Sequence, residues 1–425
     1  MPTQRFHDAD RPPAADRRIF LQRASALATS LALAPDLLAA TVPGETWYGT
    51  WGTALTGPAP ATSALAFSNQ TLRLIVHASI GGSRVRVRLS NEMGGTALSI
   101  GAAWLGLAAS AANLAAGSNR QLSFAGRAAA TVARGGTLAS DPLDLAVPAQ
   151  ANLALSLYLP GSVQAATVHD AAFQTSYVST SGNQAASQSL RVQRSLYAWP
   201  FLAELDIGRT AAGATLVALG DSMTDGLRST GSANRRWPDY LARRLLAAGG
   251  AGGVPVGVVN RGISGNRLLG DSDSTPLAGR DALERFDRDV LATSGVRYLV
   301  VLIGINDIIN ASSSSLPTLA DAITAGYTRL VNRAHTAGIR VLGGTLLPFE
   351  GYTWYSAARE SVRQRVNSWI RTAGAFDAVA DFDAAVRDPA RPTRMRADLV
   401  SEDLLHPKDA GYEAMARAVP LGALI

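Results

Sequence analysis

Gly220-Asp221-Ser222-Met223-Thr224-Asp225-Gly226 follows directly on Ala214-Thr215-Leu216-Val217-Ala218-Leu219, a short apolar run that is rich in strand-forming residues. A helical pattern begins soon after it, at Trp237. We therefore expect Ser222 at the turn where a buried strand ends, which is where a parallel α/β sheet presents its reactive groups. A serine on a glycine-flanked turn is either a nucleophile or a polar turn residue, and this stretch alone does not decide between the two.

Strand-like and helix-like segments alternate from this stretch onward, as is typical of a parallel sheet covered by helices on both faces. The expected strands are 215–219, 254–260, 298–303, 340–346 and a weaker one at 378–381. The expected helices are 237–247, 278–292, 318–337 and 357–373. The pattern predicts a three-layer α/β/α domain with a parallel sheet over residues 214–425.

The preceding region, residues 46–208, has a different pattern. Valines and a leucine alternate with arginines over Ser83–Leu89, and a similar alternation recurs over Asn152–Leu159, so each segment predicts a strand with one buried face. Glycine pairs such as Gly81-Gly82 separate these segments as turns. We expect an antiparallel β-sandwich of jelly-roll-like arrangement here, joined by a linker at 209–213 to the α/β region.

Composition excludes several classes of site. The 425 residues include no cysteine, so disulfides, thiolate metal sites and cysteine nucleophiles are excluded. The formal charge of +6 is spread along the chain without basic blocks, which indicates a solvated surface and no nucleic-acid partner. Beyond the first forty residues no apolar stretch reaches the length of a membrane span.

The first forty residues have the pattern of an export signal. Asp16-Arg17-Arg18-Ile19-Phe20-Leu21-Gln22 resembles the twin-arginine consensus, and a mildly apolar region follows over 24–34. The alternative is an ordinary N-terminal helix. We expect residues 1–40 to be a twin-arginine-type signal peptide, which predicts a periplasmic or secreted protein.

A nucleophilic Ser222 needs a base, and histidine is the usual one. Of the five histidines, four have settings that suggest other roles, namely His7, His77, His169 and His335. His406 precedes a proline, which places it on a loop entering a helix. Asp403, three residues earlier, could hold the His406 ring in the right tautomer, or could simply cap a turn.

Two further glycine-containing segments follow the next two expected strands. Asn260-Arg261-Gly262-Ile263-Ser264-Gly265-Asn266 comes after the second strand, and Gly304-Ile305-Asn306-Asp307 after the third. An esterase must bind the oxyanion of its tetrahedral intermediate with backbone N–H groups or side-chain amides. Gly262 and Asn306 are candidates for this, although each alone could be a turn residue.

Together these four segments resemble the SGNH/GDSL hydrolase superfamily, whose letters match Ser222, Gly262, Asn306 and His406 in order. The resemblance covers residues 214–418. It implies that Ser222 is the nucleophile, His406 the base and Asp403 its orienting acid. It also implies an oxyanion hole of the Ser222 and Gly262 amides and the Asn306 side chain, with no metal or cofactor. An α/β-hydrolase is disfavoured because Ser222 lacks the Gly-x-Ser-x-Gly pattern.

Two residues are candidates for substrate binding. Asn266 either contacts substrate or braces its own segment. Trp354 follows the fourth expected strand, on the same edge of the sheet, and either walls the substrate site or caps the core.

The region before the α/β domain, with Asn69–Arg73 and Val85–Asn91, is similar to a bacterial subgroup described as xylan-esterase-like. This similarity implies an exported serine esterase acting on short acyl esters, with O-acetyl groups of a polysaccharide as the first choice of substrate. The alternatives are a broad lipase, arylesterase or thioesterase, a protein whose function is dominated by a carbohydrate-binding β domain, and an inactive binding protein. The sequence leaves the oligomeric state open.

Overall fold

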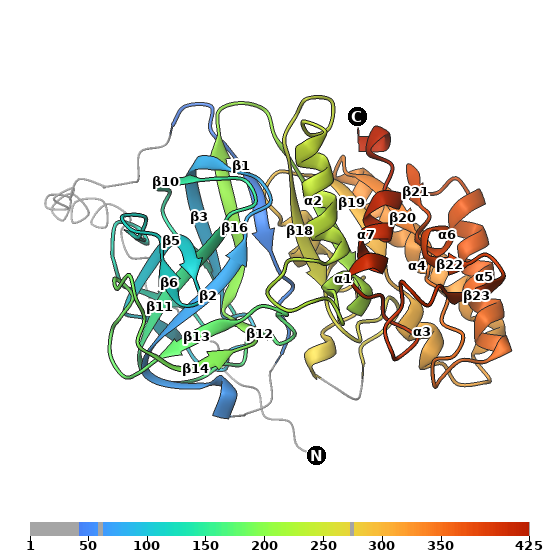
Figure 1. The fold of residues 1–425 in the computed structure, drawn as a ribbon, viewed down its shortest axis with the longest axis horizontal. Helices are drawn as coiled ribbons and strands as arrows, with labels where there is room; N and C mark the ends of the chain where they lie inside the picture. Colours follow the sequence, from blue (N-terminus) through green and yellow to red (C-terminus); the bar gives the residue numbers. More distant parts are fainter. Residues whose placement is uncertain (1–41, 58–62, 273–275, 425) are drawn as a thin grey trace, which may run out of the picture. The chain divides into compact units, whose positions relative to one another are not determined.

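The computed structural model describes residues 42–57, 63–272 and 276–424 (Figure 1). The predicted signal peptide at 1–40 lies outside these ranges. Within them, no helix has the length and apolarity needed to cross a membrane.

A five-stranded sheet, in which every neighbouring pair is parallel, forms the centre of the C-terminal region. Its order is β18 (Val256–Gly262), β17 (Ala214–Gly220), β19 (Val296–Leu302), β20 (Arg340–Gly344) and β21 (Ala378–Ala380). All seven residues of β17 are buried, as expected of a strand covered on both faces. The predicted parallel sheet is confirmed.

Helices follow the strands, and the direction of the crossovers decides which face each one covers. From β17 the chain passes through α2 (Trp237–Ala247) to β18. From β19 it moves along the sheet in the opposite direction, through α4 (Leu316–Thr336) to β20 and through α5 (Ala357–Thr372) to β21. Because such crossovers are right-handed, α2 covers one face and α4 and α5 the other. Helix α7 (Asp409–Ala418) packs against α2, and α6 (Phe382–Val386) packs against α7. Three layers result.

The expected helix at 278–292 is wrong as a continuous element. The short 3₁₀ turn η2 (Pro276–Ala278) ends where the segment begins, and the segment itself contains the π-helical turn η3 (Asp287–Leu291). Gly279 has φ +68°, a left-handed conformation that interrupts a helix. The remaining short elements are α1 (Ser222–Asp225), α3 (Ile305–Ile309), η4 (Leu421–Leu424), β22 (Arg387–Asp388) and β23 (Arg391–Met395).

The N-terminal region consists mainly of two antiparallel sheets, as predicted. One has the order β1 (Thr46–Gly52), β16 (Leu202–Arg209), β3 (Gly82–Ser90) and β10 (Leu143–Val147), with β9 (Thr137–Ala139) also on β3. The other has the order β14 (Val192–Leu196), β13 (Ser176–Ser179), β2 (Ala66–His77), β11 (Asn152–Gln164), β5 (Ala102–Ser110) and β6 (Asn113–Leu114), with β7 (Arg120–Gln121) also on β5. Three small elements complete the region: η1 (Ser63–Leu65), the pair β4 (Leu98–Ile100) and β8 (Ala130–Val132), and the pair β12 (Val168–His169) and β15 (Trp199–Pro200).

One hydrophobic core joins the two antiparallel sheets. It contains Val85 and Val87 from β3 together with Leu74 from β2 and Leu155 from β11. In β3 the buried valines alternate with half-exposed arginines, which is the period-2 pattern read from the sequence. The sheets therefore form a sandwich, called the β domain below; the jelly-roll arrangement stays a prediction.

The β domain packs against β18, an edge strand of the parallel sheet. Val258 of β18 donates its N–H to Ser79 Oγ at 2.9 Å, and Gly49 of β1 donates to Thr215 Oγ1 at 2.9 Å. A Cβ placed on Gly257 would lie 2.0 Å from Gly49 O, so the two backbones approach closely. The β domain thus covers an edge that would otherwise expose unpaired backbone groups.

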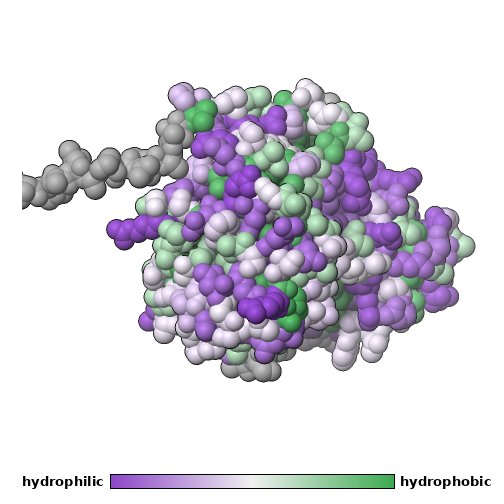
Figure 2. Space-filling model, turned by 60° about the vertical axis from the view of Figure 1, so that its left-hand side comes forward, coloured by the Kyte–Doolittle hydropathy of each residue, from purple (hydrophilic) through white to green (hydrophobic). Residues whose placement is uncertain are grey.

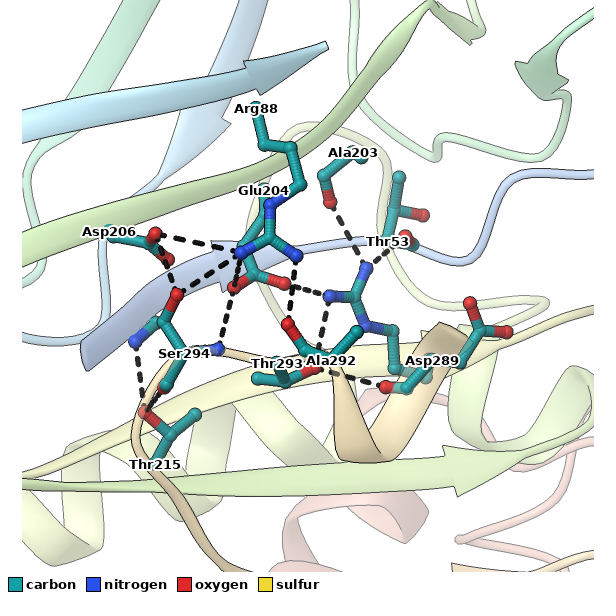
Figure 3. Close-up of polar contacts among 12 residues, drawn as sticks. Thr53, Arg88, Ala203, Glu204, Asp206, Thr215, Asp289, Ala292, Thr293 and Ser294 are labelled. Carbon is teal, nitrogen blue, oxygen red and sulfur yellow. Dashed lines mark hydrogen bonds and ion pairs between the residues drawn. The ribbon is translucent and has the colours of Figure 1, made fainter. Parts of the chain in front are cut away.

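A polar cluster lies beside this contact, drawn in Figure 3. Arg88 and Asp206 of the β domain reach Ser294, whose N–H is accepted by Glu204 at 3.1 Å. On the remaining surface, the face shown in Figure 2 has hydrophilic and apolar side chains interspersed.

Candidate active site

The turn that carries Ser222 follows directly on the end of β17. Gly220 is required there, because a Cβ would lie 2.2 Å from Thr224 Oγ1 and 2.4 Å from Leu302 O. Asp221 then caps α1 by accepting the Met223 N–H at 3.0 Å. Gly226, with φ +96°, ends this single helical turn. Ser222 is therefore the first residue of a short helix at the carboxyl end of β17.

Ser222, His406 and Asp403 form a continuous chain of hydrogen bonds. Ser222 Oγ lies 2.9 Å from His406 Nε2, and His406 Nδ1 lies 2.8 Å from Asp403 Oδ2. A carboxylate can only accept, so Nδ1 carries the ring hydrogen and Nε2 is left to accept the hydroxyl proton. Ser222 and His406 are 5% and 8% exposed, which keeps the pair largely out of bulk water.

The loop before His406 holds the Asp403 carboxylate. Asp403 Oδ1 accepts the N–H groups of Leu405 at 3.0 Å and His406 at 2.9 Å, and the Ser401 hydroxyl at 2.9 Å. Arg228 Nε approaches Oδ2 at 3.2 Å. Partial burial raises the pKa of Asp403, but the hydrogen bonds from His406 and the backbone outweigh burial and hold the pKa well below its usual range. Asp403 is therefore ionised throughout the neutral range.

Asn306 lies beside the loop that follows β18. It belongs to α3, which begins after Gly304 at φ +123°. Asn306 Nδ2 donates to Asn266 O at 3.0 Å, which uses one of the two amide hydrogens and leaves the other available. The structure thus brings the third and second glycine-containing segments together.

Gly262 has a different role from the predicted one. Its N–H donates to Asn260 Oδ1 at 2.8 Å, so this hydrogen is already used. A Cβ on Gly262 would lie 2.2 Å from the Asp225 N, so the glycine allows β18 to approach α1. The prediction of Gly262 as an oxyanion donor is corrected: here it is a close-packing residue.

Gly265 is the better candidate donor. Residues 263–266 form a turn closed by the Asn266 N–H on Ile263 O at 3.0 Å, and Gly265 has φ +82° within it. Across the described ranges, no acceptor is found for the Gly265 N–H. The pattern Gly262-Ile263-Ser264-Gly265 contains both glycines, but it does not show which N–H is free.

Asn266 braces its own segment. It is 1% exposed, and its Nδ2 donates at 2.7 Å to both Ala278 O and Arg280 O. Its Oδ1 accepts Arg285 Nε at 3.1 Å. Of the two alternatives read from the sequence, the contacts support bracing and leave no polar atom of this side chain for substrate.

Arg285 was not singled out from the sequence. Its fully buried guanidinium donates to Gly220 O at 2.9 Å and to Arg261 O at 2.8 Å, and it pairs with Asp289 at 2.8 Å. It therefore ties the ends of β17 and β18 to Asn266. The sequence carries no signal for this, because Arg285 lies in a segment with a helical pattern, where an arginine is an ordinary residue of the solvent-facing side.

Trp354 lies in the turn region after β20 and is 56% exposed. It does not cap the core, which removes that alternative. A role as a wall of the substrate site stays a prediction.

Residues 218–414 match the GDSL-like Lipase/Acylhydrolase family. Solved structures with similarity to the chain include a putative lipolytic protein of the G-D-S-L family from Desulfitobacterium hafniense (22% identity, TM-score 0.36, covering 50% of this chain and 100% of that one). They also include a variant of an acetyl xylan esterase from Geobacillus stearothermophilus (26%, 0.37, 49% and 93%) and a putative arylesterase from Agrobacterium tumefaciens (20%, 0.35, 48% and 96%). No curated protein matches the chain. The family match includes Ser222, Asp403 and His406 and excludes the β domain.

Proposed function

Since residues 218–414 belong to the GDSL-like lipase/acylhydrolase family and the chain is a carboxylic ester hydrolase, we propose that it acts through an acyl-enzyme formed on Ser222. The observation that carries this proposal is the continuous chain from Ser222 Oγ through the His406 ring to the ionised Asp403.

In the first half-reaction His406 Nε2 takes the Ser222 hydroxyl proton while Oγ attacks the ester carbonyl carbon. The charge that develops on the carbonyl oxygen is met by the Ser222 N–H, the free Asn306 amide hydrogen and the Gly265 N–H. His406 then gives its proton to the departing alcohol. In the second half-reaction His406 activates water, which releases the acid and restores the Ser222 hydroxyl.

We propose short acyl esters as substrates, with O-acetyl groups on a polysaccharide as the first choice. The twin-arginine-like stretch at 16–22 supports export to the periplasm or beyond, where such polymers are met. A broad lipase, arylesterase or thioesterase activity is the alternative. A carbohydrate-binding role of the β domain has little support, because among its described residues Tyr197 is the one exposed aromatic side chain.

The Ser222→Ala variant tests the assignment of the nucleophile. We expect kcat on p-nitrophenyl acetate to fall by about 10⁴-fold or more, because residual rate can come only from binding and the oxyanion donors. Thermal unfolding of the variant should match that of the wild type. Retention of substantial hydrolysis would contradict the proposed site.

Substrate choice is tested separately with the wild-type protein. Initial rates are compared on acetylated xylan and on p-nitrophenyl esters from acetate to octanoate. The polysaccharide proposal requires acetate release from xylan; a preference for octanoate without such release would replace it with a lipase.

A further inference from the structure

His169 connects the β domain to the candidate active site. It belongs to β12 and is 3% exposed. Its Nδ1 lies 2.9 Å from Ala54 O, and its Nε2 lies 3.0 Å from Asp225 Oδ1. Asp225 is the last residue of α1, the helical turn that begins with Ser222.

Both partners of the His169 ring can only accept hydrogen bonds. A backbone carbonyl has no hydrogen to give, and neither has an ionised carboxylate. The two contacts are therefore both made only when Nδ1 and Nε2 each carry a hydrogen. The geometry requires an imidazolium paired with the Asp225 carboxylate in a buried setting.

Asp225 also forms hydrogen bonds with the loop after β18. Its second oxygen, Oδ2, accepts the Ser264 N–H at 3.1 Å and the Ser264 hydroxyl at 2.7 Å. Ser264 directly precedes Gly265, whose N–H is the candidate oxyanion donor. A carboxylate held between His169 and Ser264 therefore fixes the position of this loop relative to α1.

The surroundings of His169 favour the charged ring. Burial lowers the pKa of His169, but Asp225 and the Ala54 carbonyl outweigh burial, so the pKa is raised from its ordinary 6.5; Arg236 opposes this. The ring also stacks on Trp199 with centroids 5.6 Å apart. The other titratable groups near it are His77 and Asp239, which line the same small cavity, and Asp170, its neighbour in the chain.

We propose that His169 is a positioning residue for ester hydrolysis. Through Asp225 and Ser264 it lets the β domain hold the turn at residues 263–266, called the oxyanion loop here because it carries the Gly265 N–H. The inference rests on the proposed function, since it assigns the loop a part in the reaction. It also gives the β domain a direct part in catalysis that does not depend on binding a carbohydrate.

The variants His169→Gln and His335→Gln test this in the full-length protein. His335, on α4, is exposed and its Nε2 lies 2.9 Å from Asp377 Oδ2, so the same substitution there is a matched control. For His169→Gln we expect kcat to fall about tenfold or more, as for a small displacement of a transition-state group, with KM nearly unchanged. His335→Gln should behave as wild type. An unchanged kcat in His169→Gln would overturn the proposal.

The pH dependence of kcat distinguishes a positioning role of His169 from a role in packing alone. Because the pKa of His169 is raised, its link to Asp225 persists above pH 6.5 and is lost as the pH rises through the folded-state value. Wild-type kcat should therefore decline at alkaline pH. The glutamine of His169→Gln has no proton to lose over this range, so the lower kcat of that variant should stay flat. An identical alkaline decline in both proteins would count against the proposal.

A spectroscopic measurement on the wild type covers the case in which His169→Gln does not fold. In ¹⁵N-histidine-labelled protein, the His169 ring should show two protonated nitrogens at pH 7, where an ordinary histidine is mostly neutral. Its resonance is assigned by elimination with variants in which each of the other four histidines, His7, His77, His335 and His406, is replaced by glutamine. A neutral His169 at this pH overturns the proposal. This result is independent of activity, so it stands even if no ester is hydrolysed, an outcome that would refute the proposed function instead.

Discussion

At the scale of single residues, Asp221 is an unusual neighbour of the nucleophile. It is 1% exposed; its Oδ1 caps α1, and within the described residues its Oδ2 has no hydrogen-bond partner. Burial raises the pKa of Asp221 to about 7, and the nearby Asp307 adds to this, while Arg285 opposes it. Asp221 is thus largely protonated below neutral pH and ionises at a cost above it.

Asp221→Asn should remove this cost. In the unfolded chain Asp221 ionises near its ordinary pKa of 3.8, so between about pH 4 and 7 the folded state binds more protons and wild-type stability falls as the pH rises. Asparagine keeps the capping oxygen and does not titrate. We therefore compare the free energy of unfolding of the variant with that of wild type at each pH. This difference should shift by about 2 kcal/mol in favour of the variant when the pH is raised from 5 to 8.

Urea unfolding at the two pH values measures this difference. Asp144→Asn is the matched control, because the Asp144 side chain is 90% exposed and should show little change. A stability difference for Asp221→Asn that is the same at pH 5 and pH 8 would contradict the argument.

Strand order places the Ser222 turn at the carboxyl edge of the sheet, and the resemblance of the four segments to one family predicted that Asp403 and His406 meet Ser222 there. The sequence pointed to Gly262 as an oxyanion donor, and this was wrong because the Gly262 N–H is taken by the Asn260 side chain, whose direction no sequence pattern shows. The contact between His169 and Asp225 spans 56 residues, and no local pattern encodes a pairing at that separation.

At the scale of elements, the site depends on the close approach of β18 to α1. The Cα and N atoms of Asp225 lie 2.7 and 2.2 Å from the position that a Cβ on Gly262 would take. Asn260 strengthens the same contact, since its Nδ2 donates to Thr224 O at 2.7 Å. Backbone atoms cannot give way as a flexible side chain can, so any added methyl must separate the two elements.

Gly262→Ala should therefore lower both stability and activity. We expect a loss of about 1–3 kcal/mol in the free energy of unfolding, as for overpacking in a core, and a kcat reduced at least about tenfold because α1 carries Ser222. Gly95→Ala is the control, because a Cβ there meets nothing within 4 Å. Denaturant unfolding and p-nitrophenyl acetate kinetics measure both effects. Wild-type behaviour of Gly262→Ala would show that the two elements can separate without cost.

The strands of the parallel sheet were predictable because they are near-continuous apolar runs, a pattern that needs no knowledge of neighbours. The irregular structure of the segment 278–292 was not predictable, because tertiary contacts override its helical spacing of apolar residues. Arg285 is drawn inward to the ends of β17 and β18, and Gly279 adopts a positive φ. Such contacts are visible only once the strands have been assembled.

At the scale of the whole molecule, the β domain is joined to the α/β domain through buried charge. Arg261, at the end of β18, forms an ion pair with Glu204 of β16 and donates to Ala203 O at 3.1 Å. The side chains of Arg261 and Glu204 are 4% and 0% exposed. Arg88 lies 3.7 Å from the same glutamate, and Figure 3 shows Arg88 and Glu204 converging with Ser294. A boundary with such contacts differs from a flexible linker between independent domains.

Arg261→Met should therefore destabilise the whole protein. It leaves Glu204 buried without its main partner, and breaking a buried pair in this way costs about 3–5 kcal/mol. The double variant Arg261→Met/Glu204→Met replaces both charges with apolar side chains and should recover much of that loss, since such replacements are often close to neutral. Arg396→Met is the control, because Arg396 and Asp398 form an exposed pair worth less than about 1 kcal/mol.

Urea unfolding followed by tryptophan fluorescence measures all four proteins, and tryptophans in both domains should report one transition. If Arg261→Met stays within about 1 kcal/mol of wild type, or the double variant is no more stable than the single one, the two domains do not depend on this pair.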